Sequence, residues 1–156
     1  MDSASAFYLY TMNQLTEIHV SYKPTILSHK NITNSREAYE TVLKHWNKHT
    51  IELYEEVKVM YFNRANKLLG IHDLSKGGIS STIIDVRRVL SVALKCNASG
   101  FILVHNHPSG TLSPSKADKD ITDRMDSCAK QMDIELLDHL IITRDGYYSF
   151  RDEGVL

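Results

Sequence analysis

Apolar residues recur along the chain with two spacings, and each spacing predicts a different kind of element. Runs that alternate with polar residues, or that are apolar throughout, are typical of strands. They cover residues 7–22, 56–62, 67–71, 101–104, 134–143 and 147–150. Spacings of three and four residues are typical of amphipathic helices. They cover residues 35–49, 85–97 and 115–132.

Polar residues predict where these elements begin and end. Ser35, Asp85 and Ser115 each stand at the start of a helical pattern, where a side-chain oxygen can accept hydrogen bonds from free backbone N–H groups. Residues 63–66 and 144–146 have the composition of hairpin turns, and residues 72–84 form a stretch rich in turn residues. The helix that Asp85 begins has one apolar face, made by Val86, Val89, Leu90, Ala93 and Leu94.

Composition sets limits on the class of protein. The 156 residues suffice for one domain with a single core, and 42% hydrophobic with 24% charged residues is typical of globular proteins. A formal charge of -1 gives no support to nucleic-acid binding. No apolar run is long enough to cross a membrane, and residues 1–7 lack the regions of a signal peptide. With only two isolated cysteines, we expect a cytoplasmic protein without a membrane partner, and the sequence leaves a homo-oligomer open.

Two histidines directly follow the apolar run of residues 101–104. In a strand, His105 and His107 are two residues apart, so both imidazoles point to the same face. Asp118 lies one turn into the helix that Ser115 begins. If this helix runs back over the sheet, a carboxylate oxygen reaches the two imidazoles. Such a placement would form a zinc site of two histidines and one carboxylate, with one position open to water; two strand-end histidines without a metal are the competing interpretation.

The same residues resemble a known signature. His105-x-His107 followed at fixed spacing by Ser115 and Asp118 resembles the JAMM motif of the MPN-type metalloproteases, and the strings HNHPSG and SPSKAD are similar to the RadC branch of that superfamily. Two other classes fit poorly. HNH nucleases spread their residues over a hairpin and a helix, and zinc nucleoside deaminases need H-x-E with a later P-C-x-x-C.

The resemblance covers residues 35–156 and implies a fold for them. That fold is the three-layer α/β MPN fold (JAB/JAMM), with a mixed, curved β-sheet flanked by helices. Residues 1–34 are then interpreted as N-terminal edge strands and a connection to this RadC-like domain, so that the whole chain forms one compact unit.

The resemblance also implies roles for site residues. His105, His107 and Asp118 hold one Zn²⁺ per chain, Glu55 is the general base, and Ser115 hydrogen-bonds the oxyanion of the intermediate. Ser115 as a simple helix N-cap is the competing interpretation. Glu56 competes with Glu55, and the two point to opposite faces of the strand that follows.

The dipeptide Asp138-His139 also matches the RadC pattern. One of its members could support a metal-binding imidazole, or the pair could be purely structural at a sheet edge. The sequence does not decide between these two interpretations.

Two functions fit these features. The first is a zinc-dependent hydrolase of the RadC/JAMM type, which would cleave a peptide or isopeptide bond with a metal-activated water and would have a peptide or protein as its partner. The alternative is a non-catalytic MPN scaffold or a factor associated with DNA repair, the label that the RadC family carries. The intact ligand set favours the enzyme, because scaffolding MPN domains commonly lose these residues.

Overall fold

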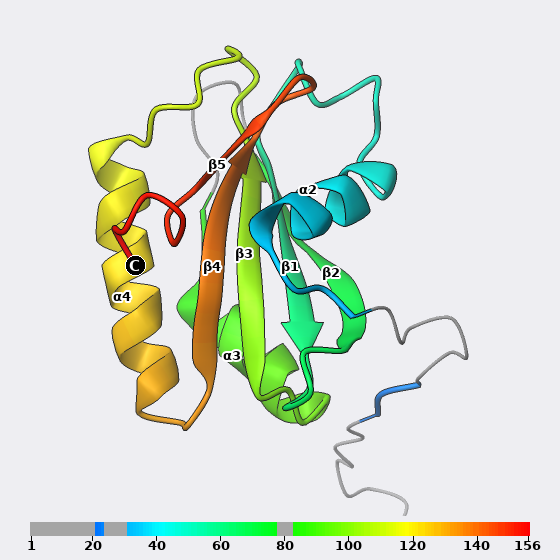
Figure 1. Ribbon diagram of the computed structural model, residues 1–156, viewed down its shortest axis with the longest axis vertical. Helices are drawn as coiled ribbons and strands as arrows, with labels where there is room; N and C mark the ends of the chain where they lie inside the picture. The colour runs from blue at the N-terminus through cyan, green and yellow to red at the C-terminus, as the bar shows by residue number, and fades with distance from the viewer. Residues whose placement is uncertain (1–20, 24–30, 78–82) are drawn as a thin grey trace, which may run out of the picture.

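The computed structural model describes residues 21–23, 31–77 and 83–156. Within these ranges, helices and strands follow one another along the chain (Figure 1). They are α2 (Ser35–Lys44), β1 (Glu56–Phe62), β2 (Leu68–Lys76), α3 (Val86–Lys95), β3 (Gly100–Asn106), α4 (Lys116–Lys130), β4 (Glu135–Ile142) and β5 (Tyr147–Ser149). Most of the predicted strand region 7–22 lies outside the described residues, so that prediction stays a prediction.

The five strands form one mixed sheet in the order β2-β1-β3-β4-β5. Only β3 and β4 run parallel, and the chain crosses between them through α4; the other three pairs are antiparallel. A loop of residues 107–115 connects β3 to α4 and brings the first turn of α4 back to the carboxyl end of β3, where Asp118 meets His105 (Figure 1). The α/β architecture is confirmed, and it is consistent with an MPN-like fold.

Two hydrophobic cores lie on opposite faces of the sheet, which gives the fold three layers (Figure 1). Alternation along β1 separates them, since Val57 and Val59 face α3 and α4 while Met60 and Phe62 face α2. All seven residues of β3 are buried, as its continuous apolar run predicted. The strand that carries His105 and leads into His107 is therefore enclosed between the two cores.

The first helix differs from its prediction at both ends. Asn34 is the N-cap in place of Ser35, because the Asn34 side chain accepts a hydrogen bond from the Glu37 backbone N–H at 2.9 Å. The helix ends at Lys44 and not near residue 49. Beyond it, Asn47 accepts hydrogen bonds from the His49 and Thr50 backbones and starts a series of turns.

Two further predictions needed correction. The strand β2 extends to Lys76, although its polar residues Ser75 and Lys76 resembled a turn; pairing with Val57 and Glu56 of β1 holds them in the sheet. Leu94 does not belong to the buried face of α3, since it is 54% exposed. Asp85 and Ser115 do cap α3 and α4 as predicted. No helix in the described ranges is long and apolar enough to cross a membrane.

Candidate metal centre

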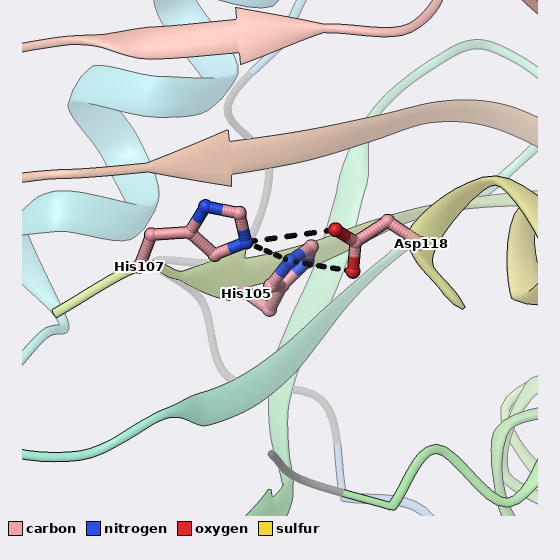
Figure 2. A group of neighbouring side chains, drawn as sticks. All are labelled: His105, His107 and Asp118. Carbon is pink, nitrogen blue, oxygen red and sulfur yellow. Dashed lines mark hydrogen bonds and ion pairs between the residues drawn. The ribbon is translucent and has the colours of Figure 1, made fainter. Parts of the chain in front are cut away.

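Three side chains, from β3, from the loop that follows it and from α4, converge on one point (Figure 2). The Nε2 atoms of His105 and His107 lie 3.0 Å apart. Asp118 places Oδ1 3.1 Å from His105 Nε2 and Oδ2 3.6 Å from His107 Nε2. No other group of three potential ligand residues is found within the described part of the chain. The structure therefore brings together the three residues that the sequence suggested, in an arrangement that could hold a metal ion.

Backbone contacts of the loop after β3 hold the second histidine. The backbone N–H of His107 donates to the Ile142 carbonyl of β4 at 3.0 Å, which continues the strand alignment beyond Asn106. The chain then turns at Gly110, whose φ of +78° suits glycine. The turn lets His107 Nδ1 donate to the Thr111 carbonyl at 2.6 Å. With its proton on Nδ1, the neutral imidazole presents an unprotonated Nε2 to the site.

The third candidate ligand is held by the helix cap. Ser115 Oγ accepts from the Asp118 backbone N–H at 3.1 Å, and Asp118 Oδ2 accepts from the Ser115 backbone N–H at 2.7 Å. This reciprocal pair is a capping box. The Ser115 hydroxyl also donates to Asp118 Oδ2, at 2.6 Å. Ser115 therefore does act as an N-cap, and the same contacts aim the carboxylate at the histidines.

Electrostatics at the site favour a charged carboxylate. Burial alone would raise the pKa of Asp118, but the imidazoles of His105 and His107, which donate to its carboxylate when Nε2 carries a proton, outweigh burial and hold that pKa well below its usual range. The hydrogen bond to Asp118 raises the pKa of His107, against the effect of burial. The charges of Asp118 and Glu55 raise it further. The centre therefore attracts positive charge, whether that charge is a proton or a metal ion.

We expect zinc affinity to fall as the pH is lowered through the raised pKa of His107. A zinc ligand must be a neutral imidazole, so protons compete with the metal. Asp118 stays charged because its pKa is lowered, so losses between about pH 8 and pH 5 come from imidazole protonation. Zinc titrations against a competing chelator over this range would measure the effect. An affinity that does not change with pH would contradict it.

The raised pKa of His107 has a different consequence for the zinc-free protein, whose stability should fall as the pH rises. A folded-state pKa above the unfolded value means that protonation of His107 stabilises the fold. This contribution is complete below the unfolded pKa and is lost as the pH rises through the folded one. Thermal melts of zinc-free protein should therefore show this contribution to stability decreasing with rising pH in the region where zinc binding strengthens.

The dipeptide Asp138-His139 divides its roles between the two sides of β4. His139 Nε2 lies 2.9 Å from His105 Nδ1, so His139 stands directly behind a candidate ligand. Asp138 instead accepts hydrogen bonds from Ser149 Oγ at 2.6 Å and from the Arg151 backbone N–H at 3.1 Å, which anchor the end of the chain. His139 therefore has the geometry of a residue that supports a metal-binding imidazole, whereas the contacts of Asp138 are structural.

The two candidate glutamates have different surroundings. Glu56 is 2% exposed and faces the α2 side, where Thr50 Oγ1 donates to its Oε1 at 2.9 Å and Lys58 Nζ lies 4.0 Å from its Oε2. Glu55 precedes β1 and lies close enough to His107 for its charge to raise the pKa of that residue. Of the two, Glu55 is therefore the one associated electrostatically with the candidate ligands.

Asn106, between the two histidines, points to the opposite face and is fully buried. Its Oδ1 accepts from the Glu56 backbone N–H at 2.7 Å, and its Nδ2 donates to the carbonyls of Ile51 and Tyr54 at 2.6 and 3.0 Å. A buried group that loses its partner costs about 1–3 kcal/mol. Asn106 therefore ties the segment that carries Glu55 to the strand that carries the ligands. Sequence reasoning missed this contact, because its partners are about fifty residues away.

A cavity of about 290 Å³ adjoins His107, one of the candidate ligands. Its lining includes His107 and Gly110 from the loop after β3, together with Ile51 and the turn at Arg144. Arg144 contacts Glu52 across this region, with 3.0 Å between Nη2 and Oε2. The cavity is large enough to accept a side chain or a short stretch of peptide beside the site.

The fold and these side chains define a class of protein: an α/β domain with a two-histidine, one-carboxylate site at the junction of a central strand and a helix. The family model of the RadC-like JAB domain matches residues 32–155. The chain belongs to this family.

Relatives agree with this assignment. The chain is 47% identical over 131 residues to a "UPF0758 protein" of Flavobacterium johnsoniae, an alignment that covers 83% of the chain and 56% of the relative. It is 34% identical over 155 residues to a protein of the same name in Clostridium tetani, covering 98% of the chain and 65% of the relative. The chain thus spans between about half and two thirds of the length of these relatives, and their names specify no activity.

Proposed function

We propose that this protein is a zinc-dependent hydrolase that cleaves peptide or isopeptide bonds. The observation that carries the proposal is the convergence of His105, His107 and Asp118, with both Nε2 atoms and the carboxylate meeting at one point (Figure 2). Two imidazoles with one carboxylate form a ligand set of catalytic zinc sites, which leave a fourth position for water. Membership of the RadC-like JAB family supports the same conclusion.

The donor set fits zinc better than calcium or magnesium, because those ions prefer oxygen ligands throughout. When bound, one zinc ion per chain would supply a Lewis acid and lower the pKa of a bound water to about 7. The neutral Nε2 atoms of His105 and His107 and one Asp118 oxygen would hold the ion. The Asp118 oxygen bound by the Ser115 cap would stay fixed to the helix.

Glu55 would act as the general base. Its charge acts on His107, and its carboxylate would accept a proton from the attacking water and return it to the leaving amine, so that the proton is conserved over the cycle. Ser115 would stabilise the oxyanion only if its hydroxyl turned from Asp118 Oδ2 toward the substrate. Its capping contacts are compatible with a second role, because the backbone N–H of Ser115 would still hold Asp118.

The substrate would be a peptide or protein segment lying in the cavity beside His107. The balanced charge of the chain gives no support for nucleic acid as the substrate. Cys96 and Cys128 are free thiols, which suits a reducing compartment, and we place the protein in the cytoplasm.

Cleavage of a peptide library, together with lysine-linked isopeptides, tests the proposal. We expect the zinc-loaded protein to cut a subset of substrates, a chelator to stop the reaction, and added zinc to restore it. A protein that binds zinc stoichiometrically but cuts no member of either library would favour the non-catalytic scaffold. Cleavage that persists after complete removal of metal would contradict the proposed mechanism.

A further inference from the structure

A closed series of hydrogen-bonding groups runs behind His105 and returns to Asp118. The Thr122 hydroxyl on α4 donates to the Asp118 backbone carbonyl at 2.6 Å. The same hydroxyl oxygen lies 2.6 Å from His139 Nδ1, and His139 Nε2 lies 2.9 Å from His105 Nδ1. His105 Nε2 then faces Asp118 Oδ1 at 3.1 Å. The series thus connects the backbone of one candidate ligand to the side chain of another.

The proton positions along this series follow from its first member. The Thr122 hydrogen is used on the Asp118 carbonyl, so the hydroxyl oxygen can only accept from His139 Nδ1–H. A neutral His139 carries one proton, which leaves its Nε2 as an acceptor. That acceptor requires the hydrogen of His105 on Nδ1, and Nε2 of His105 is left as a lone pair facing the candidate metal position.

Burial keeps the series from rearranging. His139 is 0% exposed and Thr122 is 1% exposed, so solvent water does not replace their hydrogen bonds. The same burial disfavours a charged imidazole, so the ring is neutral. Phe150 stacks on that ring at 4.8 Å with an interplanar angle of 13°, so packing also restricts rotation of the imidazole.

We propose that Thr122 and His139 are positioning residues that hold His105 in the Nδ1–H tautomer and thereby make its Nε2 available to a metal ion. The inference rests on the metal site of the proposed function and extends it to two residues that do not touch the ion. His107 is held in the same tautomer by a different contact, the hydrogen bond from its Nδ1–H to the Thr111 carbonyl. The two ligands are therefore prepared by separate sets of contacts, and each can be tested separately.

Removal of the Thr122 hydroxyl should move the protons of His139 and His105 to the other nitrogen of each ring. Without this acceptor, His139 Nδ1–H would be buried without a partner, a state that costs about 1–3 kcal/mol. His139 avoids this cost by moving its proton to Nε2, which then donates to His105 Nδ1. His105 must then carry its own proton on Nε2, at the position where the metal would bind. Thr122→Val should therefore weaken zinc binding although Thr122 is no ligand.

The experiment compares Thr122→Val with Thr122→Ser in the full chain. Valine keeps the shape of threonine and loses the hydroxyl, whereas serine keeps the hydroxyl and loses a buried methyl group. Loss of such a supporting contact typically lowers metal affinity about 10- to 100-fold. We expect a decrease of that size for Thr122→Val, measured by competition with a chromophoric chelator, and an affinity near wild type for Thr122→Ser.

A purely structural role would act through folding stability, so thermal melts of the zinc-free proteins separate the two explanations. Thr122→Ser loses a buried methyl group and should melt below the wild type while keeping its zinc affinity, whereas a purely structural role would lower its affinity together with its stability. Thr41→Val is the matched control, because Thr41 on α2 also donates to the carbonyl four residues earlier, at 2.6 Å, on the other face of the sheet. It should leave zinc affinity unchanged.

Nitrogen NMR of the histidine rings gives a second readout that does not depend on activity. His105 should appear as the Nδ1–H tautomer in the wild type and in Thr122→Ser, and as the Nε2–H tautomer in Thr122→Val. Equal zinc affinity and the same tautomer in all three proteins would overturn the inference while leaving the metal site intact. If the wild type itself bound no zinc, the proposed function would fail with it.

Discussion

Glu55→Gln should remove most of the turnover and leave the zinc site filled. Glutamine is nearly isosteric with glutamate but cannot accept a proton at neutral pH. General acid–base assistance typically contributes about 10²- to 10⁴-fold, so we expect kcat to fall by that order on any substrate identified, with little change in KM. Zinc content and melting temperature should match the wild type, because Glu55 is not among the converging ligand atoms.

Glu56→Gln is the matched control for this prediction. It makes the same chemical change one residue away, on a side chain that faces the α2 side and contacts Thr50 and Lys58. We expect activity near wild type, together with some loss of stability from the buried contacts. Full activity in Glu55→Gln combined with loss in Glu56→Gln would show that the proposed base is wrong by one position.

His107→Ala should abolish zinc binding, and Asp118→Asn should weaken it strongly. Alanine removes one of the two imidazoles, and asparagine replaces the only charged ligand with a neutral group of the same shape. Both effects should exceed the 10- to 100-fold typical for contacts behind a ligand. Isothermal titration of metal-free protein with zinc would measure them.

His45→Ala is the control for the ligand substitutions. His45 directly follows α2, its side chain is exposed, and it does not belong to the converging group. Its removal should leave zinc binding unchanged. Equal loss of zinc in His45→Ala and His107→Ala would place the metal elsewhere.

The parts of the site that sequence could predict are those fixed by local rules. Strand parity placed His105 and Asn106 on opposite faces, and a cap signal placed Asp118 in the first turn of α4. Both follow from residues close together in the chain. The convergence of β3 with α4 followed only from the spacing of a known motif, because apolar periodicity does not reveal how distant elements meet.

The contacts that sequence did not reveal are long-range or depend on competition between neighbours. No local sequence signal marks Thr122, and its contact with His139 exists only because α4 packs on β4. Asn34 and Ser35 are both good capping residues, and tertiary contacts distinguish them, since the Ser35 hydroxyl lies 3.1 Å from that of Tyr147. Glu55 and Glu56 were separable only once the partners of Glu56 were known.

Elemental analysis of the purified protein tests the central claim most directly. The protein would be loaded with zinc, desalted, and compared with His107→Ala treated in the same way. The account predicts close to one zinc ion per chain for the wild type and almost none for the variant. A wild type that retains no transition metal after zinc loading, or a variant that retains as much zinc as the wild type, would contradict it.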